Sequence, residues 1–177
     1  MTNRQYEFSW DFIGDIEEGR PNLGHDTRIE VYRLFQYTLR DVLEARYGTE
    51  ETDRILYEAG FKAGIEFFRQ TIERETNAKL DLGSFIEHVK DRLLQFKIGI
   101  LRIEQASEAE LTFVLTVAED LDCSGLPDMG HAVCTYDEGF IAGIFHRYSG
   151  KNFDVKEVDC WCTGDRTCRF RVQPKAT

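Results

Sequence analysis

The sequence predicts an α+β fold in which N-terminal helices precede a largely antiparallel β-sheet. Between residues 27 and 96 the apolar side chains recur every three or four positions, as in amphipathic helices. After residue 98 they alternate in short runs rich in β-branched residues, which is typical of strands. Only one more helical stretch, residues 130–148, follows. Helices that come before the strands, instead of alternating with them, favour α+β over a parallel α/β sheet.

The first half of the chain predicts an arm followed by three helices. Residues 1–24 contain three glycines and a proline, which indicate extended segments and turns. Residues 25–174 are then expected to form a single domain. Thr27 to Glu30 and Ser84 to Glu87 both have the spacing of a capping box, so we expect helices to begin at Thr27 and Ser84. Gly48 supplies a stop, and a second helix begins near Thr49.

Small residues in two of the helices predict a close approach. Gly60 and Gly64 stand four apart in the second helix, where each costs about 1 kcal/mol relative to alanine. Their presence indicates contact with another helix or with a ligand, and helix packing is the commoner reason. The fourth helix, over residues 130–148, carries Gly139 and Gly143 at the same spacing.

The strands are expected in two hairpins. Residues 98–103 and 111–117 form the first, around a polar turn. Residues 153–159 and 168–172 form the second, around Thr163-Gly164-Asp165.

Composition and charge exclude several classes of function. The chain has 177 residues, of which 42% are hydrophobic and only 3 are proline, so it is not a disordered linker. Its formal net charge of -10 argues against direct binding of nucleic acid or an anionic membrane. The acidic residues at 119–122 are expected at the solvated surface. No apolar run is long enough for a membrane span or a signal sequence, so we expect a cytoplasmic protein.

The five cysteines predict a metal site. Cys160, Cys162 and Cys168 surround one short turn, which brings three thiols within reach of one ion. Cys134, at the start of the fourth helix, is an attractive fourth ligand because a helix N-terminus favours a thiolate. Spacing alone therefore favours a four-cysteine site. The alternative is that these cysteines are small buried hydrophobic residues. Cys123 has no assigned role.

The segment from Glu157 to Phe170, together with residues 123–127 and Cys134 at the start of a glycine-containing helix, resembles the 4-vinyl-reductase (4VR) domain family. The resemblance extends from about residue 21 to residue 172. It implies a ligand-binding fold of the TRAPP and NO-signalling type, commonly dimeric. The family includes sensor domains of aromatic-responsive, sigma-54-dependent regulators and many proteins predicted to bind hydrocarbons.

The resemblance also implies which residues bind the metal. The aromatic sensors hold it with three cysteines and one glutamate, which fall here on Cys134, Glu157, Cys160 and Cys168. Cys162 then becomes a neighbour of the site. Four protein ligands leave no open position, so we expect a structural zinc ion that fixes the last hairpin to the fourth helix.

A ligand pocket is expected among apolar residues. The candidates are Phe113, Phe140, Ile141, Ile144 and Val155, and the alternative for each is an ordinary place in the core. A phenylalanine stands where the resemblance leads us to expect an indole, and Val155 stands where it leads us to expect a phenol. Both differences favour a more apolar ligand than phenol.

These expectations together describe a non-enzymatic, zinc-stabilised binding or sensor protein for a small hydrophobic ligand that is aromatic, hydrocarbon or lipid-like. We expect a homodimer, and if the protein regulates, it must act through a partner. Two alternatives stay open. One is an accessory protein or reductase acting on the vinyl group of a tetrapyrrole, although no nicotinamide or flavin motif is present. The other is a TRAPP-like dimeric interaction scaffold.

Overall fold

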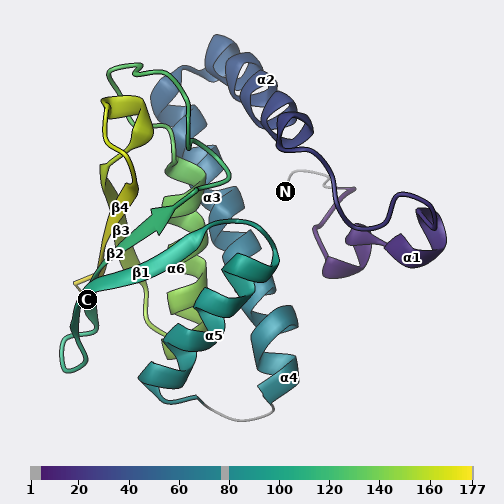
Figure 1. Ribbon diagram of the computed structural model, residues 1–177. Helices are drawn as coiled ribbons and strands as arrows, with labels where there is room; N and C mark the ends of the chain where they lie inside the picture. The colour runs from purple at the N-terminus through teal and green to yellow at the C-terminus, as the bar shows by residue number, and fades with distance from the viewer. Residues whose placement is uncertain (1–4, 77–79, 177) are drawn as a thin grey trace.

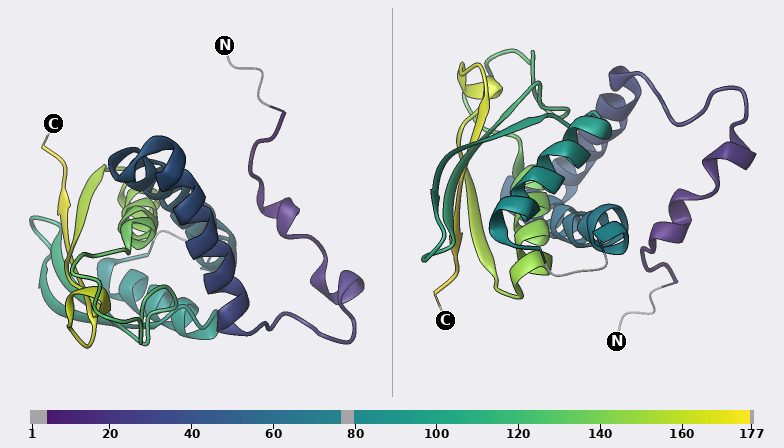
Figure 2. Two further views of the ribbon diagram at one scale, coloured as in Figure 1. Left: turned by 90° about the horizontal axis from the view of Figure 1, so that it is seen from above. Right: turned by 60° about the horizontal axis from the view of Figure 1, so that its bottom comes forward.

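The computed structural model describes residues 5–76 and 80–176, which form a set of helices packed against one four-stranded antiparallel sheet (Figure 1). The predicted α+β class is therefore confirmed. The N-terminal arm contains two single turns, η1 (Trp10–Ile13) and α1 (Ile16–Gly19), and stands to one side of the body (Figure 2).

The helices and strands follow the predicted order. The helical elements are α2 (Ile29–Tyr47), α3 (Thr49–Phe68), its π-helical continuation η2 (Arg69–Glu73), α4 (Arg74–Thr76), α5 (Leu82–Gln95), α6 (Thr135–Ser149) and the single turn η3 (Trp161–Thr163). The strands are β1 (Ile100–Ser107), β2 (Thr112–Ala118), β3 (Phe153–Asp159) and β4 (Cys168–Pro174).

The last strand of the chain lies inside the sheet. The strand order is β1-β2-β4-β3, so β4 joins the two hairpins by pairing with both β2 and β3. Phe170 is the partner of Leu115 on one side and of Glu157 on the other. This arrangement places the start of β4 beside the end of β3 and beside the loop that follows β2.

The core lies between the sheet and α6, which α3 covers from the other side (Figures 1 and 2). Its apolar centre contains Phe85, Phe153 and Phe170, all at most 1% exposed. Burial of such aromatic side chains supplies most of the free energy that stabilises a domain of this size.

The contact between α3 and α6 depends on four glycines. A Cβ atom placed on Gly60 or Gly64 would lie 2.0 or 2.1 Å from a backbone oxygen of α6, and one on Gly139 or Gly143 would lie 2.1 or 2.2 Å from a backbone oxygen of α3. The close approach predicted for Gly60 and Gly64 is therefore confirmed, and its partner is a helix.

Three helix starts differ from the prediction. The N-cap of α2 is Arg28, with no side-chain cap, so the capping box predicted at Thr27 was wrong. The N-cap of α5 is Asp81, whose Oδ1 accepts a hydrogen bond from the backbone N–H of Ser84. Helix α6 begins at Thr135, since the preceding residues make a glycine-containing loop.

Helix α2 packs its polar side inward. Its regularly spaced apolar residues Val31, Phe35, Leu39 and Val42 are all exposed, with Phe35 at 68%. Their periodicity correctly predicted a helix but did not show which face it would bury. Within the part of the chain that the structure describes, no helix has the length and apolar character needed to cross a membrane.

Candidate metal centre

Five metal-ligating side chains meet at one end of the sheet. The donor atoms of Cys123, Cys134, Glu157, Cys160 and Cys168 all lie within 4.8 Å of one another. Each cysteine is at most 1% exposed, and Glu157 is 6% exposed. The four residues that the family resemblance implies as ligands are thus brought together. The fifth, Cys123, was missed.

The spacing of the sulfur atoms suits a tetrahedral ion. Thiolates bound at about 2.3 Å to one zinc ion stand roughly 3.8 Å apart. The Sγ atoms of Cys134 and Cys160 are 3.8 Å apart, and those of Cys160 and Cys123 are 3.9 Å apart. Cys123 and Cys168 are closer, at 2.9 Å, which is a hydrogen-bonding contact between thiols. No disulfide joins the five cysteines.

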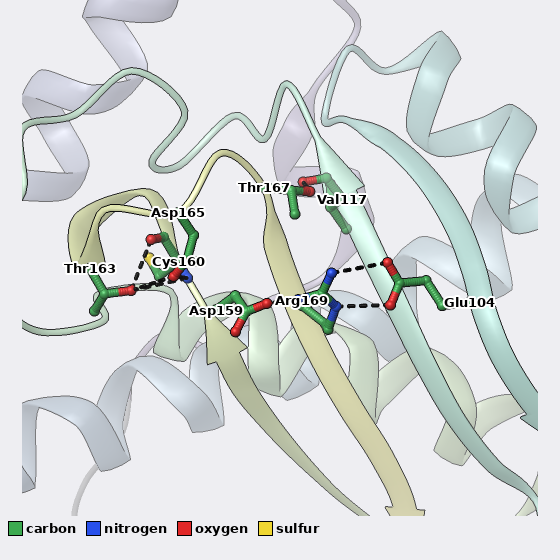
Figure 3. Close-up of polar contacts among 8 residues, drawn as sticks. All are labelled: Glu104, Val117, Asp159, Cys160, Thr163, Asp165, Thr167 and Arg169. Carbon is green, nitrogen blue, oxygen red and sulfur yellow. Dashed lines mark hydrogen bonds and ion pairs between the residues drawn. The ribbon is translucent and has the colours of Figure 1, made fainter.

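The turn between β3 and β4 positions Cys160 (Figure 3). The hydroxyl of Thr163 donates to the carbonyl of Cys160 at 2.9 Å and to Asp165 Oδ2 at 3.0 Å. The backbone N–H of Cys160 donates to the side chains of Thr163 and Asp165, with Thr163 Oγ1 at 3.2 Å. Gly164 closes the turn at a φ of 92°, which favours glycine.

A β-bulge explains why Glu157 and Cys160 face the same interior. The register of β3 against β4 shifts between Glu157 and Asp159, so Val158 is an extra residue and is 42% exposed. Strict alternation would turn residue 160 away from residue 157. The bulge changes that alternation, and both side chains are buried in the cluster.

The other two predicted ligands come from adjoining elements. Cys134 is the N-cap residue of α6, and Cys168 is the first residue of β4. Glu138, one turn into α6, accepts a hydrogen bond at 2.9 Å from the backbone N–H of Glu157 and pairs with Lys156 at 2.9 Å. Helix α6 and strand β3 are therefore connected directly beside the cluster.

The carboxylate of Glu157 fits a metal ligand. Both of its oxygens are buried and have no hydrogen-bond partner among the described residues. An unpaired buried carboxylate is costly, and a bound cation is a normal way to offset that cost. Burial raises the pKa of Glu157 to about 8.

The thiols perturb one another's ionisation. Hydrogen bonding among the sulfurs, with Cys123 as the largest contributor, raises the pKa of Cys134 and of Cys168 and lowers that of Cys160. Closely spaced thiols resist simultaneous ionisation, and a divalent cation removes that resistance. The donor set therefore fits a bound metal ion.

The loop that carries Cys123 is anchored by buried acids. Asp120 Oδ1 accepts hydrogen bonds from the backbone N–H groups of Asp122 and Cys123, at 2.9 and 3.0 Å. Asp122 in turn accepts from Tyr32 at 2.8 Å and from Gln36 at 2.6 Å, both on α2. Asp120 and Asp122 are 3% and 2% exposed, so their predicted place at the solvated surface was wrong. Burial raises the pKa of Asp120 to about 7.

Cys162 is buried but does not belong to the five-residue group. Its backbone carbonyl accepts the N–H groups of Met129 and Gly130 at 2.8 and 3.1 Å. Burial raises the pKa of its thiol to about 12. This position agrees with the role of neighbour that the resemblance implied, in place of the ligand role that spacing alone had favoured.

The five residues predicted to line a ligand pocket, Phe113, Phe140, Ile141, Ile144 and Val155, are all buried in the core at 9% exposure or less. Aromatic neighbours fill the space beside two of them. The ring of Phe113 lies 5.0 Å from that of Phe145, and the ring of Phe140 lies 5.2 Å from that of Phe67. A pocket at this position stays a prediction.

An apolar cavity of about 220 Å³ lies between α2, α3 and the start of α6. Its lining residues are Tyr32, Phe35, Gln36, Tyr37, Leu39, Arg40, Leu56, Ala59, Val133 and Tyr136. Val133 precedes the cluster residue Cys134, and Tyr37 donates to the backbone carbonyl of Asp122 at 3.0 Å, next to Cys123. The cavity and the cluster are therefore connected through residues next to Cys134 and Cys123.

Comparison with known proteins supports the family resemblance. Residues 113–174, which include all five residues of the cluster, match the model of the V4R domain. An uncharacterized protein of Methanocaldococcus jannaschii is 26% identical over 154 residues, which cover 85% of this chain and 80% of that protein.

Three solved structures have a similar fold. A vinyl-4-reductase family protein from M. jannaschii superposes with a TM-score of 0.58 at 18% identity, covering 86% of this chain and 85% of the other. The phenol-responsive sensory domain of the transcription activator PoxR, solved with phenol, gives a TM-score of 0.63 at 15% identity, covering 84% of this chain and 75% of the other. Subunit 3 of a trafficking protein particle complex from Naegleria fowleri, covalently bound to palmitic acid, gives a TM-score of 0.61 at 13% identity. The match covers 84% of this chain and 95% of the other.

Proposed function

We propose that this chain, which carries a V4R domain in a fold shared with ligand-binding sensor domains and a TRAPP subunit, is a zinc-stabilised binding protein for a small, largely apolar molecule. The observation that carries the proposal is the apolar cavity built against a buried cluster of metal-ligating residues.

The metal would act as a cross-link. Its ligands, Cys134, Glu157, Cys160 and Cys168, come from the start of α6, from β3, from the turn after β3 and from the first residue of β4. A bound zinc ion supplies structural stabilisation, and four protein ligands leave no place for a substrate or a water. We therefore propose a non-enzymatic role.

The size of the cavity limits the ligand. An engineered cavity of about 150 Å³ in another protein holds benzene, whereas pockets for drug-sized ligands reach about 300–1,000 Å³. A volume of about 220 Å³ thus suits a single aromatic ring with a small substituent or a short alkyl chain. The phenol of the PoxR domain is a ligand of this size, although similarity of fold alone does not place it here.

Two polar atoms on the cavity wall would orient the ligand. Arg40 donates to Glu44 at 2.9 Å and to Asp53 at 2.6 Å, which leaves its Nη1 buried without a partner in the described structure. Gln36 donates to Asp122, which leaves its Oε1 without one as well. One unsatisfied donor and one unsatisfied acceptor suit a ligand with a single hydroxyl or amide group.

The proposal is tested first on the purified protein. Denaturing extraction followed by mass spectrometry should release a small apolar molecule. A bound tetrapyrrole would favour the reductase alternative instead, and an empty protein that binds none of the probes below would favour the scaffold.

A matched pair of variants tests the location. Ala59→Leu should narrow the cavity and abolish the rise in unfolding temperature caused by phenol, toluene or hexanoic acid. Ala45→Leu makes the same change at an exposed position of α2 and should leave that rise intact. If Ile144→Phe alone abolishes the rise in unfolding temperature, the ligand binds in the predicted core pocket instead.

We also propose that the chain is a homodimer formed through α2. The exposed apolar residues of this helix are Ile29, Val31, Leu34, Phe35, Leu39 and Val42. Such a contiguous apolar face is typical of an interaction surface. Phe35 and Leu39 also line the cavity, so a second copy placed there would cover its mouth.

Light scattering after gel filtration tests the dimer. Leu34→Glu should give monomers because it places a charge in the proposed interface. Leu94→Glu changes a similarly exposed leucine of α5, 60% against 66% exposed, and should leave the dimer intact. A monomeric unmodified chain would contradict the proposal.

The net charge of -10 supports an indirect role in any regulation, because nucleic acid would repel this chain.

A further inference from the structure

We infer that a second zinc ion binds beside the first, held by Asp120, Asp137 and the thiolate of Cys134, which bridges the two ions. Ligand atoms of these three residues lie within 4.8 Å of one another. The inference rests on the proposed metal centre. It leaves all four ligands of that centre in place and adds a site next to it.

The side chain of Asp137 is the first argument. Asp137 lies in the first turn of α6, whose N-cap residue is Cys134, and it is 9% exposed. An acid at such a position often caps its helix, but no side-chain cap hydrogen bond forms at this helix start. Its Oδ2 is buried and has no hydrogen-bond partner among the described residues. An unused, buried carboxylate oxygen beside two further ligand groups points to a cation between them.

The local charge is the second argument. Asp120, Asp122 and Asp137 are all buried, and none of them forms an ion pair within the described part of the chain. Arg33 reaches the same loop, but its guanidinium donates to backbone carbonyls there. The first ion does not neutralise these acids, because its own three thiolates and one carboxylate already outweigh its positive charge. Carboxylates held together in the interior resist ionisation, and a second divalent cation removes that resistance.

The chemistry of the donors is the third argument. Zinc accepts both carboxylate oxygen and thiolate sulfur, and a thiolate has enough lone pairs to bind two ions. Asp120 is held in position by the backbone N–H groups that its Oδ1 accepts, as a metal ligand requires. Three protein ligands leave the fourth coordination position to water. The second ion is therefore held more weakly than the first, and dialysis against a weak chelator should remove it alone.

A zinc titration tests the inference and needs no activity. The full chain is freed of metal with a strong chelator, and Zn²⁺ is added back while native mass spectrometry counts the bound ions. The unmodified chain should take up two ions, the second at least about tenfold more weakly, because three side chains hold it instead of four. Asp137→Asn should keep the first ion and lose the second. Asp41→Asn makes the same change at an exposed position of α2 and should keep both.

The possible failures are distinguishable. An unmodified chain that takes up one ion would overturn the inference and leave the metal centre in place. Two ions in Asp137→Asn would also overturn it, since the second would then be an adventitious ion only. A chain that takes up no zinc would overturn the metal centre itself. Asp120→Asn keeps an oxygen for the backbone N–H groups and should also lose only the second ion, so it replaces Asp137→Asn if that variant does not fold.

Discussion

Individual side chains decide how well the loop that carries Cys123 is anchored to the rest of the structure. Tyr32 and Gln36 extend from α2 to the buried carboxylate of Asp122, which lies next to Cys123 in the chain. When a buried carboxylate loses a hydrogen-bond donor, the free energy of removing it from water is no longer offset, and the folded state is destabilised. The polar face of α2 therefore helps to hold the loop that carries Cys123 beside the cluster.

Removing one hydroxyl tests this anchoring. Tyr32→Phe should lower the free energy of unfolding by about 1–3 kcal/mol, because Asp122 loses the hydrogen bond at 2.8 Å. Tyr47→Phe removes the hydroxyl of a tyrosine that is 56% exposed and should change stability by less than about 0.5 kcal/mol. Urea denaturation of both variants measures the difference, and equal effects would show that the contact with Asp122 contributes nothing.

Four of the five donor residues could be predicted, but on unequal grounds. Cys160 and Cys168 follow from the convergence of thiols on one turn, and Cys134 follows from its place at the start of a helix. Glu157 came only from the family resemblance. The burial of Glu157 depends on the extra residue Val158, and a β-bulge leaves no clear mark in the sequence. Cys123 approaches the cluster because β2 and β4 are neighbours, a pairing between distant segments that cysteine spacing does not reveal.

Among the secondary-structure elements, the pair α3 and α6 has the strictest packing requirement. Each helix presents two glycines to the backbone of the other, so none of the four positions has room for a methyl group. The spacing of Gly60 and Gly64 was enough to predict a close contact. The capping residues were harder to predict, since Asp81 caps α5 from a position three residues before the serine that the pattern indicated.

Adding one methyl group tests the helix contact. Gly64→Ala should cost about 3 kcal/mol, because its Cβ would lie 2.1 Å from the backbone oxygen of Phe140 and the helices must separate. Gly19→Ala, where no atom lies within 4 Å, should be nearly neutral. Thermal unfolding of the two variants compares them, and a neutral Gly64→Ala would mean that the helices pack less closely than described.

The sheet has an ion-pair bridge on its outer side. Arg169 of β4 donates to both carboxylate oxygens of Glu104, at 2.8 and 3.2 Å, and pairs with Asp159 (Figure 3). Glu104 lies at a shift in register of β1 against β2. The bridge thus connects β1, β4 and β3 across the sheet.

This bridge is expected to contribute little. Arg169→Gln should destabilise the protein by less than about 1 kcal/mol, and the difference should shrink as salt is added, since Arg169 is 33% exposed and water screens the pair. Denaturation at low and high ionic strength measures it. A loss of several kcal/mol that salt does not change would indicate a structural role for the bridge that its exposure does not suggest.

For the whole molecule, the sequence predicted the α+β class and the order of the elements, because helical periodicity fills the first half of the chain and strand periodicity, interrupted by one helix, fills the second. It did not predict that α2 would turn its apolar residues outward, since periodicity identifies a face without identifying what covers it. The exposed face of α2, the cavity beneath it and the cluster of four cysteines and one glutamate are adjacent. Ligand, partner and metal would therefore all act on one end of the domain.

Removing the metal should weaken the whole domain. Structural zinc sites contribute on the order of 10 kcal/mol of apparent folding free energy in small peptides, and about 1 kcal/mol changes the unfolding temperature of a protein of this size by roughly 2–4 °C. A strong chelator should therefore lower the unfolding temperature by about 10 °C or more, and added Zn²⁺ should restore it. Calorimetry with and without the chelator provides the comparison, and an unchanged temperature would show that the cluster stabilises the fold without an ion.

The metal content of the purified chain tests the central claim most directly. Elemental analysis by mass spectrometry, after dialysis against a weak chelator, should find one zinc ion for each chain. A folded chain that retains no metal, and takes up none when Zn²⁺ is supplied, would contradict the account.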